Sequence, residues 1–169
     1  SSDGGRSWRE VDGAHRPPNG DLEAVAGQLV DGTLHLVHQA DRTWYYRFHT
    51  SDHPTAPDRW AAAHERLGAE ADPPTQVAAL AAFGDGAVVA VYGGDASLRY
   101  RRRAPGGAWS AEALVGAGPR DTLTAPMAVA GADGEAHLAY VDLAGRAWLR
   151  RVRPDGTLTP AVPVASGLA

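Results

Sequence analysis

The sequence contains no cysteine, no lysine and no long apolar run. Without cysteine the chain has no disulfide, no thiolate nucleophile and no cysteine-ligated zinc site. No segment approaches the roughly 18 consecutive apolar residues of a membrane-spanning helix, so we expect no membrane partner. All 16 basic residues are arginine. We interpret this as the codon bias of a GC-rich genome, the alternative being selection for the planar guanidinium group.

Positive charge and methionine are also scarce. The 16 arginines face 20 Asp and Glu residues, which gives a formal net charge of −4. A nucleic-acid binder needs a basic surface, so we expect no nucleic-acid partner. The chain begins at Ser1, shows no signal peptide and has Met127 as its one methionine. We therefore expect a mature form or a piece of a longer protein. The compartment stays open, and secretion is compatible with the absence of cysteine.

What the chain does contain is an all-β pattern that occurs three times. Asp31–His49, Asp85–Arg103 and Asp133–Arg153 each begin with an Asp-Gly turn, and each continues with an apolar run, a polar turn and a second run. The 20 glycines and 12 prolines suit many short strands joined by tight turns. An all-β unit that returns about every 50 residues is typical of the blades of a β-propeller. The 169 residues are enough for one domain with a core and too few for two ordinary ones.

The segment Ser1–Trp8 has the spacing Ser-x-Asp-x-Gly-x-Ser-Trp. This spacing resembles the Asp-box of sialidase-like (BNR-repeat) β-propellers, where the box is a structural turn between the third strand of a blade and its outermost strand. Later copies are degraded, because Thr50–Trp60 carries an insertion, Ala104–Trp109 lacks the Ser and Asp, and Arg153–Leu158 ends in leucine. The resemblance implies a propeller through its repeat pattern more than through identity.

Aligning the repeats gives the blade boundaries. Trp8, Trp60, Trp109 and Leu158 fall at one equivalent position, which we place at the start of each outer strand. We predict one domain over residues 1–169, with an outer strand of a preceding blade at 1–12 and four-stranded blades at 22–67, 75–115 and 125–166. Residues 58–68 also have the composition of a short helix, but the repeat register favours a strand.

Three blades do not close a ring, because closed propellers have about four to eight. We therefore expect an incomplete propeller, which is either a segment of a longer chain or completed by other copies of this one.

Residues that recur at equivalent positions are best explained by packing between blades. This applies to His35 and His137, whose third equivalent is Val89, and to the set His38, Tyr92 and Tyr140. Three arginines also share one equivalent position: Arg47, Arg101 and Arg150. A set of three could bind a substrate carboxylate as in sialidases, but its regular repetition favours structural pairing between blades. Arg99 and Arg101–Arg103 resemble a solvated face, with an anion-binding patch as the alternative. We predict no catalytic residue, no metal site and no cofactor.

Polar residues that differ from blade to blade gather in the turns that open on one end of a propeller, around its axial mouth. Ligand specificity in a repeat array is expected where the repeats vary. The candidate ligand-binding residues, with two tryptophans as sugar platforms, are His15, Arg16, Asp21, Asp41, Arg42, Trp44, Asp72, Asp95, Arg120, Asp121, Asp142 and Trp148.

The predicted function is a non-catalytic recognition module for a glycan or a protein. The alternatives are a fragment of a sialidase-like glycoside hydrolase and a self-assembling scaffold.

Overall fold

The structure is a computed structural model that describes residues 24–40, 42–49, 65–69, 76–94, 97–116 and 125–165. These residues form three antiparallel sheets of four strands each, and within each sheet the strands follow one another in chain order. The predicted outer strand at 1–12 lies outside the described residues. The first sheet contains β1 (Ala24–Val30), β2 (Thr33–Ala40), β3 (Thr43–His49) and β4 (Glu65–Ala69). The second contains β5 (Gln76–Ala82), β6 (Val88–Gly94), β7 (Leu98–Arg103) and β8 (Ala113–Gly116). The third contains β9 (Met127–Ala130), β10 (Ala136–Val141), β11 (Ala147–Val152) and β12 (Val162–Ala165).

The Asp-Gly pairs make the turns that the sequence predicts. Gly86 and Gly134 have φ angles of 84° and 78°, in the left-handed region that glycine adopts without a steric penalty. The side-chain oxygen of Asp85 accepts a hydrogen bond from the backbone amide of Ala87, and Asp133 does the same for Glu135. These local bonds fix the register of the strands that follow.

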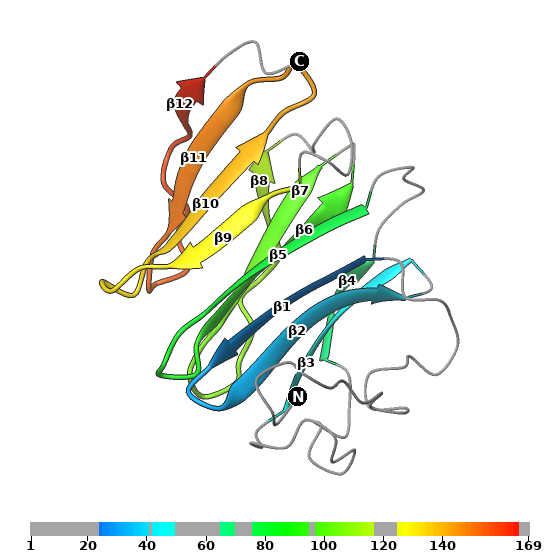
Figure 1. Ribbon diagram of the computed structural model, residues 1–169, viewed down its shortest axis with the longest axis vertical. Coiled ribbons are helices and arrows are strands. Elements are labelled where there is room, and N and C mark those ends of the chain that lie inside the picture. The colour runs from blue at the N-terminus through cyan, green and yellow to red at the C-terminus, as the bar shows by residue number, and fades with distance from the viewer. Residues whose placement is uncertain are drawn as a thin grey trace, which may run out of the picture.

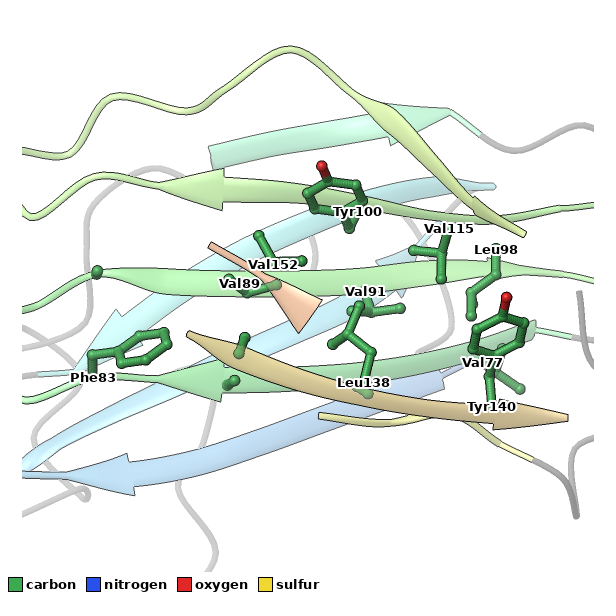
Figure 2. Close-up of a cluster of buried hydrophobic side chains, with 14 residues drawn as sticks. Val77, Phe83, Val89, Val91, Leu98, Tyr100, Val115, Leu138, Tyr140 and Val152 are labelled. Carbon is green, nitrogen blue, oxygen red and sulfur yellow. The ribbon is translucent and has the colours of Figure 1, made fainter. Parts of the chain in front are cut away.

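The three sheets stack face to face, with β1, β5 and β9 running side by side (Figure 1). A core that includes Val37, Trp44 and Tyr46 fills the space between the first and second sheets. Figure 2 shows the second core, in which Val89 and Val91 pack with Leu138 between the second and third sheets. Alternate residues of the second sheet face opposite cores, because Val89 and Val91 belong to the second core whereas Val88 and Ala90 belong to the first.

The outer strands carry a β-bulge that links neighbouring sheets. The β3–β4 ladder shifts register at Trp44/Tyr45, so that Leu67 is left over between two paired residues, and Val115 is left over in β8 in the same way. The guanidinium of Arg101 donates to the carbonyl of Leu67 at 2.9 Å, and that of Arg150 donates to the carbonyl of Val115. Each arginine thus bonds the carbonyl of the bulged residue in the preceding sheet.

The same two arginines also bond their own outer segment. Arg101 donates to the carbonyl of Ser110 at 2.8 Å, and Arg150 donates to that of Thr159 at 2.8 Å. Both arginines therefore have structural partners, but these partners are backbone carbonyls of their own and the preceding blade, not the acidic or tryptophan side chains that we expected between blades. These bonds account for two of the three repeated arginines without any ligand.

The outer strands of the second and third sheets begin later than predicted. Trp109 forms only an isolated bridge with Arg103, and Leu158 forms one with Val152, whereas β8 and β12 begin four residues beyond. The reason is that Ser110 and Thr159 use their hydroxyls to accept the backbone amides of Arg102 and Arg151, which interrupts the regular ladder.

In the first sheet, Glu65–Ala69 is strand, as the repeat register predicted for this part of 58–68. Residues 58–64 lie outside the described part.

The arginine run on β7 is not a solvated face. Arg102 is 8% exposed and lies over the ring of Phe83, and Arg103 pairs with Glu65 across the first interface. Arg99 alone among the four is well exposed, and it pairs with Glu112. The sequence interpretation was wrong here because β7 is a central strand with both faces covered by neighbouring sheets.

Among the described residues, we find no helical segment with the length and apolar composition that a membrane span requires.

Candidate functional site

A cavity of about 260 Å³ lies between the first and second sheets, at the end where β1 turns into β2. The first sheet contributes its β1–β2 turn and the inner ends of β2 and β3. The second sheet contributes its β5–β6 turn, the end of β7 and Pro105. The lining is aromatic with a few charged or polar groups: Val30, Asp31, Thr33, His35, Tyr46, Phe48, Phe83, Gly84, Gly86, Arg103 and Pro105.

His35 and Tyr46 form a bonded pair in the wall of this cavity. The Nδ1 atom of His35 lies 2.7 Å from the hydroxyl of Tyr46, and both side chains are largely buried. Burial, helped by the nearby Arg103, lowers the pKa of His35 from its ordinary value, so that the imidazole is neutral at pH 7. Burial likewise raises the pKa of the Tyr46 hydroxyl, which therefore remains protonated. Tyr46 is 0% exposed and His35 is 5% exposed, so the tyrosine hydroxyl holds the imidazole in place and the neutral ring of His35 is the group that the pair presents to a ligand.

Arg103 is held in place from two sides. Its guanidinium donates two hydrogen bonds to the carboxylate of Glu65, at 3.0 and 3.2 Å, and the indole of Trp109 donates to the same carboxylate. The guanidinium carbon also lies 5.4 Å from the ring centres of both Tyr46 and Phe48. A bidentate ion pair between aromatic rings is a rigid arrangement. Arg103 is therefore pre-positioned at the cavity.

The second interface has the same strand register but a different filling. Val89 occupies in the second blade the position that His35 has in the first blade. His35 pairs with Phe48 of β3, and Val89 pairs with the equivalent residue of β7, Arg102. In the third blade, Val152 occupies the position that Arg103 has in the second blade. Val89, Val152 and Phe83 all belong to the apolar core of the second interface. The polar cavity is thus a property of the first interface, where the blades differ in sequence.

Of the predicted axial-mouth residues, the structure describes Arg42, Trp44, Asp142 and Trp148. The others lie outside the described residues: His15, Arg16, Asp21, Asp41, Asp72, Asp95, Arg120 and Asp121. Trp44 is fully buried, with its ring centre 5.7 Å from that of Tyr92, and so presents no face to a ligand. Arg42 is exposed in the β2–β3 turn, where its φ is 60°.

Asp142 and Trp148 do come together, at the opposite end of the blades from the cavity. The Asp142 carboxylate accepts hydrogen bonds from the Trp148 indole and the Arg146 guanidinium, both at 2.9 Å. Burial opposes ionisation, but these bonds outweigh it and hold the pKa of Asp142 far below its usual range. Trp148 also borders a cavity of about 300 Å³ with Met127 and Tyr140. A ligand role for the mouth residues stays a prediction.

The residues around the first-interface cavity were not selected as ligand-binding residues in the sequence. His35 was interpreted as packing because valine replaces it in the second blade, and Arg103 was counted within an arginine run. The one signal in the sequence was that Phe48 and Arg103 break the repeat at positions where the other blades carry different side chains, whereas His35 recurs as His137 in the third blade.

No protein-family model and no curated protein matches the sequence. The fold does match a solved structure. The crystal structure of AofleA from Arthrobotrys oligospora, a β-propeller lectin, matches 97% of this chain with a TM-score of 0.60 and 10% sequence identity. The match covers 48% of the AofleA chain, so this chain spans about half of its length.

The likeness supports the predicted fold class, because three four-stranded antiparallel sheets correspond to half of a propeller. It does not extend to the sialidase-like family or the Asp-box, which stay predictions.

Proposed function

We propose that the chain is part of a non-catalytic, glycan-binding β-propeller, and that the cavity between its first two sheets holds one sugar residue. The single observation that carries the proposal is the lining of this cavity, where aromatic rings surround a neutral histidine, a tyrosine hydroxyl and a fixed arginine. Small-ligand sites typically combine an apolar, aromatic wall with a few precisely placed polar groups. The match to half of a β-propeller lectin supports the same class of ligand.

The chemistry of a sugar suits these groups. Its hydroxyls both donate and accept hydrogen bonds, and its C–H face is apolar enough to lie against an aromatic ring. In the proposed complex, Arg103 donates to sugar oxygens while Phe48 and Phe83 border the ring. His35 supplies a donor or an acceptor without adding charge. Because Arg103 is already neutralised by Glu65, a neutral sugar fits better than an acidic one.

A glycan array followed by titration calorimetry tests this proposal. Arg103→Met and His35→Ala are expected to weaken binding of the best array ligand at least about tenfold, the loss of a charged or buried hydrogen bond. Arg153→Met is the matched control, since Arg153 lies on the third sheet outside this cavity. Unchanged affinity in both cavity variants contradicts the assignment of the site. Turnover of the bound glycan contradicts the non-catalytic role.

The third sheet leaves one face open, and we propose that further blades of the same repeat cover it. The exposed residues Met127, Val129, Leu149, Val162 and Val164 gather there. Val164 occupies the bulge position that Leu67 and Val115 hold in the other outer strands. Its carbonyl is therefore where the arginine of a following blade would bond.

Molar mass by light scattering separates the sources of these blades. A dimer supports completion by a second copy. A monomer whose open face binds an apolar dye supports a segment of a longer propeller. A monomer that binds no dye contradicts the proposal.

A further inference from the structure

The turn between β9 and β10 brings together three side chains with metal-ligating atoms. Asp133, Glu135 and His137 each offer one such atom, and these atoms lie within 4.8 Å of one another. Two atoms bound to one Zn²⁺ are at most about 4.2 Å apart, because each bond is close to 2.1 Å. Asp133 and His137 are exposed, so small rotations of their side chains close that difference.

A second feature of the same turn is a space bordered by two of these side chains, Asp133 and His137, and by the backbone of Glu135. Gly131 has no side chain, and a Cβ placed there would lie 2.6 Å from Oδ1 of Asp133, 2.9 Å from Nε2 of His137 and 3.0 Å from the carbonyl oxygen of Glu135. Gly131 does not have a positive φ, so its backbone does not require glycine. Its missing side chain leaves a space surrounded by two oxygens and an imidazole nitrogen.

The combination is peculiar to the third blade. By strand register, the residues equivalent to Asp133 are Asp31 and Asp85, which the turn itself explains. Glu135 and His137, in contrast, correspond to Ala87 and Val89 in the second blade. The ligand set therefore goes beyond what the repeat needs for folding.

We propose that Asp133, Glu135 and His137 bind one divalent transition-metal ion, with Zn²⁺ the first to test. An imidazole with two carboxylates is a donor set that suits such ions better than Mg²⁺ or Ca²⁺, which prefer oxygen alone. Three protein ligands leave a coordination position for water or an exogenous ligand. His137 also lines a cavity of about 420 Å³ on the open face of the third sheet, toward which that position can open.

The neighbouring arginines tune this site. Arg151 pairs with one Glu135 oxygen at 2.8 Å, and Arg153 lies 3.8 Å from the other. Both guanidiniums are about half exposed, so solvent screens their repulsion of a cation. They compete with the ion for Glu135. Removing Arg151 is therefore expected to tighten metal binding, an effect that a purely structural cluster would not show.

The test uses the untagged full chain, freed of metal by EDTA and dialysed, in a calorimetric titration with ZnCl₂. The wild-type chain is expected to take up one Zn²⁺ saturably at this site. His137→Ala and Gly131→Ala are expected to weaken that binding about tenfold or more, the latter by filling the space. Arg151→Gln is expected to tighten it at least about twofold, because a competing cation is gone.

His35→Ala is the matched control, because His35 is the equivalent histidine of the first blade. It is expected to leave Zn²⁺ binding unchanged, and circular dichroism checks that every variant is folded. No saturable binding in the wild type, or unchanged binding in both His137→Ala and Gly131→Ala, overturns the proposal. Neither result bears on the sugar cavity, which lies between the other two sheets.

Discussion

The carbonyl of Leu67 accepts hydrogen bonds from two side chains of the next sheet. This arrangement predicts that removing both donors lowers the free energy of unfolding by more than the sum of the two single changes. The guanidinium of Arg101 donates to this carbonyl at 2.9 Å and the hydroxyl of Tyr92 at 3.2 Å. Leu67 is 3% exposed and sits at the bulge, so the strand ladder does not pair this residue. Either donor alone can satisfy the oxygen. Loss of both leaves a buried carbonyl without a partner.

The magnitudes follow from the bonds that each change removes. Arg101→Met also loses the bond to Ser110 and is expected to cost about 2 kcal/mol of unfolding free energy. Tyr92→Phe also loses the bond to Glu112 and is expected to cost about 1–1.5 kcal/mol. The double variant adds the penalty of an orphaned carbonyl, about 1–2 kcal/mol beyond the sum of the single changes.

Urea unfolding of the four proteins measures this coupling. The control is a second cycle with Tyr92→Phe and Arg150→Met, because Arg150 donates to Val115 and Thr159 and shares no acceptor with Tyr92. That cycle is expected to be additive within about 0.5 kcal/mol. If the cycle through Leu67 is equally additive, then the shared carbonyl does not couple the sheets and our account of the interface is wrong.

Three further expectations are open to direct measurement. Gly93→Ala places a Cβ 2.2 Å from the carbonyl oxygen of Ser97 at a φ of 147°, so it is expected to cost at least about 2 kcal/mol in urea unfolding, whereas Gly106→Ala, with nothing within 4 Å, is expected to be neutral. The lowered pKa of Asp142 stabilises the fold above the unfolded-state pKa of about 4, and this stabilisation is lost as the pH falls toward the folded-state pKa; Asp142→Asn should flatten the dependence of stability on pH below about pH 5. The lowered pKa of His35 keeps it neutral, so glycan affinity should fall when the pH drops below the ordinary histidine range, because protonation places a second cation beside the arginine of the cavity; an affinity that does not change across this range contradicts the role of His35.

The strands could be predicted from the sequence because their signals are local. Alternating apolar residues between Asp-Gly turns define each hairpin, and the ladders confirm that His35, Val89 and His137 are equivalent. The late start of the outer strands could not be predicted in this way. It depends on hydroxyl bonds from Ser110 and Thr159, which compete with the ladder only once neighbouring strands are in place.

The cavity between the first two sheets was harder to predict because its residues come from different sheets. Arg103 gains its role from Glu65, which lies on the preceding sheet 38 positions away. We interpreted His35 as a packing residue because Val89 occupies the equivalent position in the second blade. Val89, however, belongs to the apolar core between the second and third sheets, where no such cavity is needed. The Asp133–Glu135–His137 spacing is that of one face of a strand, so it carries no metal signature until the turn brings the atoms together.

The direction of the arginine bonds has a consequence for how such a chain can change length. Arg101 and Arg150 each reach backwards, from a later sheet to the one before it. A duplicated blade would therefore carry the arginine that bonds the preceding blade, and its outer strand would present the bulged carbonyl that the arginine of the following blade bonds. The number of blades can therefore increase by duplication without any new type of contact between neighbouring blades.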